Sequence, residues 1–178
     1  VSYEVRLQAP KSSATLFTTF SNEVSTTIPA NINGKPIPTV KHPKILGVTL
    51  DPMLTFKQHA KAVKDKINKK NNILRALAGS SWGKDKEILL TTYKAIGQSL
   101  INYCTPIWTP NLADTYFNEL QTAQSAALRI ATGCTKMTDV GHLLTECKTM
   151  AVKPHCEMLA KQFLLASTKP NHPNHTNI

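Results

Sequence analysis

Apolar residues in the N-terminal quarter of the chain lie in short runs with Thr and aromatic residues, which is typical of strands. We expect strands over residues 13–20 and 44–50, the second interrupted by Gly47. Between them, residues 26–40 contain Asn33-Gly34, a dipeptide that tolerates the positive φ angles of a tight hairpin turn. This quarter therefore predicts a small antiparallel β-hairpin region.

In the rest of the chain, apolar residues recur every three or four positions, which indicates amphipathic helices. The first helix is expected to start at a capping box formed by Thr55 and Gln58 and to end at Gly79. Further helices are expected over about residues 84–104 and 112–132. A short helix capped by Thr138 and a last helix with Pro154 in its first turn are expected to follow.

These patterns predict an α+β fold, in which the small antiparallel β-hairpin region is followed by a bundle of about four to five helices. We place the boundaries at residues 1–51 for the β region, 52–168 for the bundle and 169–178 for a polar tail expected to be disordered.

Charge indicates the class of partner. The chain has 21 Lys and Arg against 11 Asp and Glu, a formal net charge of +10. Repulsion among so many positive charges does not favour folding, so this excess indicates a polyanionic partner. Nucleic acid is the preferred candidate, and an anionic membrane surface is the second. The alternative is a basic protein that has no such partner.

The positive charge is concentrated in residues 57–94, where ten basic residues accompany three acidic ones. Lys57, Lys61 and Lys64 are spaced i, i+4 and i+7, which puts them on one helix face. A row of ammonium groups at this spacing can follow successive phosphates and release counterions. The alternative is a solvated lysine face. Because no base-reading pattern is evident, we expect binding to be directed by shape.

Other chemistries lack their motifs in this sequence. The Cys and His residues match no zinc-knuckle spacing: Cys134, His142, Cys147, His155 and Cys156. Neither a phosphate-binding P-loop nor a G-x-S-x-G nucleophile elbow occurs. We therefore expect no metal site, hydrolase site or NTPase site.

Sequence features also bear on location. No apolar run reaches the roughly 18 residues that a membrane span needs, and residues 1–6 resemble no signal peptide. Four cysteines are sparse for a secreted disulfide framework. We therefore expect no membrane association, reduced thiols, and a location in the cytoplasm or nucleus. Because the chain starts at Val1 rather than Met, we also expect it to be part of a longer protein.

Two-metal phosphoryl transfer requires carboxylates that converge from two segments, usually with an adjacent Asp pair. No two acidic residues are adjacent in this sequence, and Glu4, Glu23 and Asp51 are isolated. The chain is therefore not expected to assemble a polymerase active site by itself.

Five segments of the chain stand out in order: LQAPKSSATLFT (7–18), HPKILGVTLDPMLTFKQH (42–59), LRALAGSSWGKDKEILLTTYKAI (74–96), YCTPIWTPN (103–111) and LQTAQSAALRIATG (120–133). Together they resemble the end of the palm and the thumb of jockey-like reverse transcriptases from non-LTR (LINE-type) retrotransposons. The order and spacing of the segments match those enzymes over about residues 7–165.

The resemblance implies roles for residues of the β region. The APKSS segment is similar to polymerase motif D, so Lys11 would be the general acid that protonates the departing pyrophosphate. The alternative is a turn lysine in water. The KILGVTLD segment is similar to motif E, the primer grip, a hairpin in which Leu46 and Gly47 would let the backbone approach the primer 3′ end. Here the alternative is a bulge in an ordinary strand.

The helical part resembles the thumb, which clasps the template–primer duplex. The nucleic-acid contacts expected there are Lys57, Lys61, Lys64, Lys69, Lys70, Lys84 and Lys86. The implied partners are template RNA, primer DNA and the remainder of the reverse transcriptase. The parent enzyme would use Mg²⁺, whereas this fragment is expected to hold no cofactor, because it lacks the YxDD-type motif.

The sequence leaves two other interpretations open. The chain could be a reused retroelement fragment, acting as an effector-like or protein-interaction module with a host protein as partner. It could also be a degenerate product without function. An in-frame YxDD segment upstream would favour the polymerase fragment, and a stop codon there would favour reuse.

Overall fold

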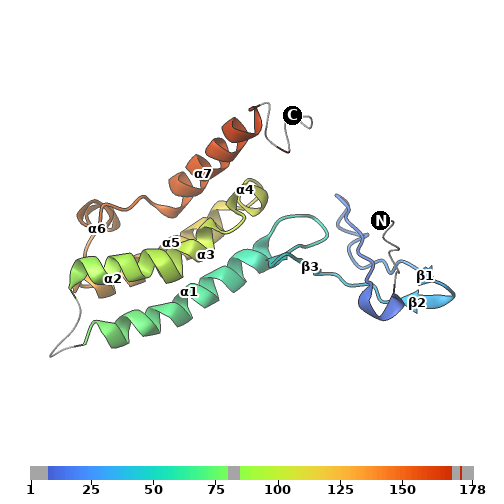
Figure 1. Cartoon of the computed structure of the whole chain (residues 1–178), viewed down its shortest axis with the longest axis horizontal. Helices are drawn as coiled ribbons and strands as arrows, with labels where there is room; N and C mark the ends of the chain where they lie inside the picture. The colour runs from blue at the N-terminus through green and yellow to red at the C-terminus, as the bar shows by residue number, and fades with distance from the viewer. Residues whose placement is uncertain (1–7, 80–84, 170–172, 174–178) are drawn as a thin grey trace, which may run out of the picture.

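The computed structural model describes residues 8–79, 85–169 and 173. Two small antiparallel sheets lie near the N-terminus and a mostly helical region follows, so the predicted α+β class is confirmed. The β1–β2 hairpin lies at one end of the longest axis, and β3 lies close to the start of α1 (Figure 1).

The first hairpin forms where the sequence predicts it. Strand β1 (Ala30–Ile32) pairs antiparallel with β2 (Lys35–Ile37). Asn33 and Gly34 join them with φ angles of 51° and 75°. Both residues adopt the left-handed conformation that Asn and Gly accept at low cost, which confirms the predicted turn.

The segment over residues 44–50 is a second hairpin rather than a single strand. Strand β3 (Lys44–Ile45) pairs antiparallel with β4 (Val48–Thr49). Leu46 and Gly47 have φ angles of 46° and 86°, and two consecutive left-handed residues reverse the chain. The prediction of one strand interrupted at Gly47 is therefore wrong, whereas a hairpin, expected here from the similarity to motif E, is present.

The strand expected over residues 13–20 is also wrong. The short helix η1 (Ala9–Lys11) precedes this segment. The one β-type pairing of residues 13–20 is an isolated bridge between Ala14 and Thr39. Farther along, the Thr18 N–H donates to the Pro52 carbonyl at 3.0 Å. Residues 13–20 therefore make single hydrogen-bonded contacts with other segments and do not join a sheet. Their content of Thr and aromatic residues, which is typical of strands, is not sufficient to form one here.

The helical region forms as the period of apolar residues predicts, with one helix divided. Its elements are α1 (Lys57–Leu77), α2 (Lys86–Tyr93), η2 (Lys94–Gln98), α3 (Ser99–Asn102), α4 (Thr105–Trp108), α5 (Asp114–Thr132), α6 (Val140–Glu146) and α7 (Val152–Ser167). The helix expected over 84–104 contains the π-helical turn η2, and α4 was not predicted. Asp139 caps α6 in place of the expected Thr138, accepting the His142 N–H at 3.2 Å.

Helix α1 does not begin with the predicted capping box. Phe56 precedes it in the left-handed conformation, with φ of 56°, and no side chain caps it. The buried Asp51 carboxylate instead accepts the Phe56 N–H at 2.6 Å and the Thr55 N–H and hydroxyl at 3.1 and 2.9 Å. Asp51 therefore ties the end of the β region to the start of α1.

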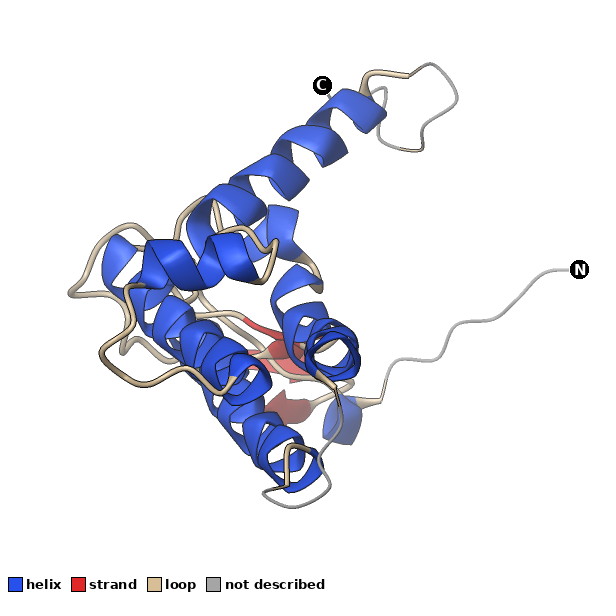
Figure 2. Cartoon of the chain, turned by 90° about the vertical axis from the view of Figure 1, so that its left-hand side faces the viewer, coloured by secondary structure: helices blue, strands red, loops and turns tan. Residues whose placement is uncertain are grey.

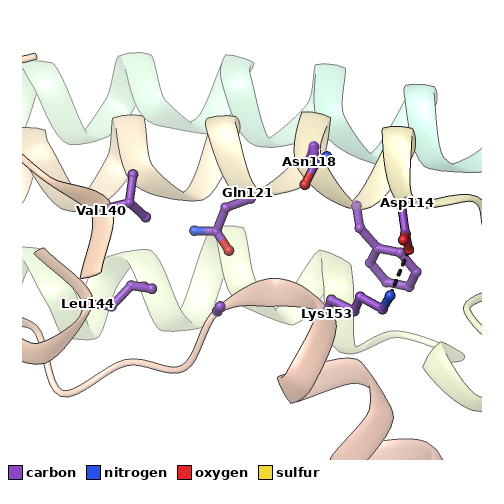
Figure 3. Close-up of a pocket in the computed structure, with 8 residues that line it drawn as sticks. Asp114, Asn118, Gln121, Val140, Leu144 and Lys153 are labelled. Atoms are coloured by element: carbon purple, nitrogen blue, oxygen red, sulfur yellow. Dashed lines mark hydrogen bonds and ion pairs between the residues drawn. The ribbon is translucent and has the colours of Figure 1, made fainter.

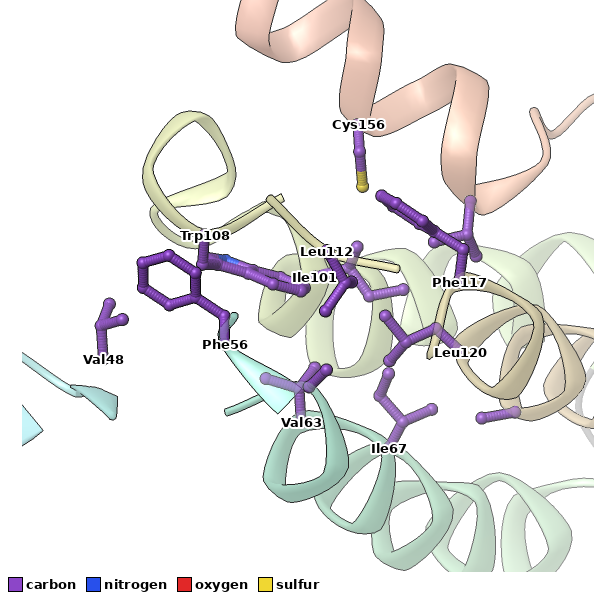
Figure 4. Packing of buried hydrophobic residues seen from close by; sticks show 13 residues of the cluster. Val48, Phe56, Val63, Ile67, Ile101, Trp108, Leu112, Phe117, Leu120 and Cys156 are labelled. Carbon is purple, nitrogen blue, oxygen red and sulfur yellow. The ribbon is translucent and has the colours of Figure 1, made fainter. Parts of the chain in front are cut away.

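The core lies between α1, α5 and the helices that cover them. In Figure 4, Val63 and Ile67 of α1 face Leu120 of α5, with Trp108 and Phe56 beside them. A second cluster continues the core toward α2 and α6. Helix α7 packs on α4 and α5 and then extends away from the other helices (Figure 1, Figure 2). Among the described residues, no helix combines the length and apolar character needed to cross a bilayer.

Candidate nucleic-acid interface

Helix α1 exposes lysines on both sides of its buried stripe. The α5 flank, as we define it, consists of Lys57, Lys61 and Lys64. The outer flank consists of Lys66, Lys69 and Lys70. The two sets diverge because each residue turns the helix by about 100°, which places residues three or four apart on the same side.

The α5 flank contacts the neighbouring helix. The Lys64 ammonium lies 3.1 Å from the Glu119 carboxylate of α5, and the two side chains are 34% and 31% exposed. The Lys61 ammonium lies 5.9 Å from the centroid of the Tyr116 ring. Two of the three lysines expected to follow phosphates therefore already have partners on α5. The third, Lys57, is exposed to solvent.

The outer flank has no such partners. Lys66, Lys69 and Lys70 are exposed, and none lies within ion-pair distance of a carboxylate in the part of the chain that the structure describes. Lys66 was not among the site residues that the sequence singled out. Its i, i+4 spacing to Lys70 is the signal that could have identified it.

Positive charge continues from the outer flank to the β3–β4 hairpin. Buried His59 of α1 accepts the Thr49 N–H of β4 at its Nδ1 atom, 3.3 Å away. Desolvation lowers the pKa of His59, and the charges of Lys66 and Lys44 lower it further. Lys44 of β3 and Lys66 of α1 therefore both lie close enough to His59 to act on its charge, so the hairpin and the outer flank each contribute a lysine to the surroundings of this histidine.

The tip of this hairpin is open on one side only. The Leu46 side chain is 84% exposed. On the other side, the Tyr103 hydroxyl donates to the Leu46 carbonyl at 2.6 Å, and a Cβ at Gly47 would lie 3.4 Å from the Tyr103 ring. The expected freedom of the backbone to approach a primer is thus limited by Tyr103, a residue that the sequence did not single out.

Two further expected contacts lie on or before α2. Lys86 forms an ion pair with Glu146 of α6, and a hydrogen bond with that carboxylate raises the pKa of Lys86. The ammonium of Lys86 thus holds α2 against α6. Lys84 lies outside the described residues.

Lys11 lies apart from the basic surface. It ends η1, which contacts β2, and its side chain is exposed. This end of the molecule is separated from most of α1 in Figure 1. Among the described residues, no three His, Cys, Asp or Glu side chains are grouped as metal ligands would be.

A pocket beside α5 is lined by none of the lysines of α1. This pocket of about 290 Å³ between α5, α6 and the start of α7 is lined by Gln121 and Leu144 among others (Figure 3). Lys153 closes one end by an ion pair with Asp114 at 2.7 Å, and its ammonium lies 5.9 Å from the Phe117 ring centroid. These contacts join α7 to α5, so the pocket is a structural junction rather than a catalytic constellation.

Comparisons of the chain with models of protein families, with curated proteins and with solved structures give no match. The function of this surface must therefore be inferred from its charge, its geometry and the resemblance of its motifs.

Proposed function

We propose that the chain is the end of the palm and the thumb of a non-LTR retrotransposon reverse transcriptase. In that role it binds a template–primer duplex through the outer flank of α1 and the β3–β4 hairpin. The observation that carries this proposal is that Lys66, Lys69 and Lys70 are exposed and form no ion pair with a carboxylate of the described residues, while Lys66 and Lys44 both act on His59.

Physical chemistry supports a polyanion on this surface. Unpaired ammonium groups on one helix side repel one another, and phosphates relieve that repulsion while releasing condensed counterions. Lys57 extends the surface at the start of α1, whereas Lys61, Lys64 and Lys86 already have partners. The partners would be template RNA, primer DNA and the remainder of the enzyme.

Chemistry would require the rest of the enzyme. The acidic residues of this chain form no adjacent pair, so the Mg²⁺ ions of the parent would be held elsewhere. Lys11 would then supply a proton to the leaving pyrophosphate only in the assembled polymerase. We expect the isolated chain to incorporate no nucleotide on a primed RNA template. Incorporation by a preparation free of other polymerases would contradict this.

A salt titration of duplex binding tests the proposal. Replacing Lys66, Lys69 and Lys70 by Ala should reduce the slope of log affinity against log salt by roughly two to three units, at about 0.7 to 0.9 per phosphate contact. A charge-matched control replaces the exposed Lys35, Lys136 and Lys161. An equal slope in the outer-flank variant and the control would refute the assigned surface.

A second candidate function has one specific observation in its favour. Phe17, Phe20, Met53 and Leu54 are 37% to 64% exposed and line a hollow of about 430 Å³. Exposed apolar patches of this kind mark protein-interaction sites. A reused fragment acting as an effector-like module would use this face and would show no salt-dependent duplex binding.

A further inference from the structure

The β3–β4 hairpin is attached to the helical region at two points. At its tip, the Tyr103 hydroxyl donates to the Leu46 carbonyl at 2.6 Å. At its base, the Thr49 N–H donates to Nδ1 of His59 at 3.3 Å. Two attachments on opposite ends of a short hairpin restrain its rotation as well as its position.

The two attachments are themselves connected through Trp108. The indole N–H of this fully buried side chain donates to the Tyr103 carbonyl at 2.9 Å. Its ring meets the His59 ring edge-on, with centroids 5.1 Å apart and an interplanar angle of 74°. Tyr103 is further fixed by its own N–H, which donates to the Ser99 carbonyl at 3.1 Å. Hairpin, α1 and α4 are therefore held in one arrangement.

The turn that Tyr103 holds is strained. Leu46 has a φ angle of 46°, a conformation that is costly for a residue with a branched side chain and cheap for glycine. Backbone strain of this kind persists where surrounding contacts enforce it, and it is concentrated at functional sites. The hydrogen bond from the Tyr103 hydroxyl is the contact that holds Leu46 in this left-handed conformation.

The strained turn presents an apolar side chain beside positive charge. Leu46 is 84% exposed and Ile45 55% exposed, while Lys44 precedes them and Lys66 lies near the base of the hairpin. The interior of a duplex offers phosphates and groove edges, whereas a strand end also offers the apolar face of its last base. An apolar tip that follows an exposed lysine, Lys44, in the same hairpin fits that end.

We infer that Tyr103 is a positioning residue, which holds the Leu46–Gly47 turn so that the Leu46 side chain contacts the terminal base of a bound nucleic-acid strand. This inference rests on the proposed function and adds a residue of the helical part to it. The neighbouring Cys104 thiol raises the pKa of the Tyr103 hydroxyl, so the hydroxyl remains a hydrogen-bond donor at neutral and moderately alkaline pH.

Two ligands with the same duplex sequence distinguish binding to the end of a strand from binding along the duplex. One is a hairpin oligonucleotide with an open end that carries 2-aminopurine as the 3′-terminal base. The other is a dumbbell closed at both ends. The wild-type chain should bind the open-ended ligand more tightly, and the fluorescence of the terminal base should change on binding.

Tyr103→Phe removes the hydroxyl and retains the ring beside Gly47. We expect it to lower the preference for the open end by about threefold to tenfold, the effect of one net hydrogen bond, and to reduce the fluorescence change. Leu46→Ala should do the same, and the double variant should lose little more, because the two residues act through one contact. For Tyr103→Phe, dumbbell affinity should stay near wild type, and the unfolding temperature should fall by no more than about 6 °C.

Tyr116→Phe is the matched control, because it removes a tyrosine hydroxyl on the α5 side of α1. An unchanged preference in Tyr103→Phe, or equal binding of both ligands by the wild type, would overturn the inference while the proposed function stands. If the wild type binds neither ligand, the proposed function fails, and the inference fails with it.

Discussion

The α5 flank and the outer flank of α1 each present three lysines, but within the described residues only the α5 flank forms an ion pair or a cation–π contact with another helix. Lys64 contacts Glu119 and Lys61 lies against Tyr116, whereas Lys66, Lys69 and Lys70 face solvent. The same residue type therefore serves packing on one side of the helix and remains available to an anion on the other.

The α5-flank lysines contribute to folding stability, whereas we propose that the outer-flank lysines contribute to binding. A partly exposed ion pair such as Lys64–Glu119 contributes about 0.2 to 1 kcal/mol, and an exposed cation–π contact about 0.5 to 1 kcal/mol. The outer lysines contribute nothing comparable to folding, because no partner is bound to them among the described residues. Their contribution appears only when a polyanion supplies the partner.

The largest difference should appear in nucleic-acid binding. Replacing Lys57, Lys61 and Lys64 by Ala should reduce the salt slope of duplex binding by about one unit, because Lys61 and Lys64 already have partners on α5 and Lys57 has none among the described residues. The outer-flank variant should lose roughly two to three units. Fluorescence anisotropy at a series of salt concentrations measures both. A steeper loss in the α5-flank variant would reverse the assignment of the two flanks.

Stability should respond in the opposite order. The α5-flank variant should lose about 1 kcal/mol of unfolding free energy, because it removes the ion pair with Glu119 and the contact with Tyr116. The outer-flank variant should stay within about 0.5 kcal/mol of the wild type. Urea denaturation followed by circular dichroism gives both values. Equal losses in the two variants would show that the flanks do not differ in packing.

The histidine at the hairpin end of the outer flank should make stability depend on pH. Burial and then the charges of Lys66 and Lys44 lower the pKa of His59 from 6.5. The folded state therefore binds fewer protons than the unfolded state, so stability is lost as the pH falls below 6.5 toward the lowered pKa. Protonation at Nδ1 would also remove the acceptor of the Thr49 N–H.

Thermal unfolding between about pH 5 and pH 7.5 measures this dependence. His59→Asn keeps an acceptor for Thr49 and should flatten the profile. Burial also lowers the pKa of His155, which contributes in the same direction, so His155→Asn is the parallel control. A profile unchanged by His59→Asn would remove His59 as the cause.

The smallest expected effect comes from freeing one lysine. Glu119→Gln leaves Lys64 without its carboxylate, which converts one α5-flank lysine to the condition of the outer lysines. The salt slope of duplex binding should then steepen by at most about 0.9 units, while stability falls by no more than about 1 kcal/mol. Glu157→Gln on α7 removes the same charge without freeing Lys64. Equal slopes in the two variants would mean that duplexes do not reach the α5 flank.

The sequence by itself determined the α+β order, the Asn33-Gly34 hairpin and the helices around α1, α5 and α7. These features are local: the turn depends on two residues that accept positive φ angles, and each helix on a spacing repeated within its own segment. A helical period also places every lysine of α1 on one side or the other of the buried stripe.

Only the tertiary structure decided which lysines are partnered. Lys64 and Glu119 are 55 positions apart, and their contact exists because the buried stripes of α1 and α5 pack together. Asp51 as the anchor of α1, and Tyr103 over the Leu46–Gly47 turn, likewise depend on neighbours that no local pattern specifies. Charge and period are properties of a segment, but the neutralisation of a charge requires a partner, and packing across the core selects that partner.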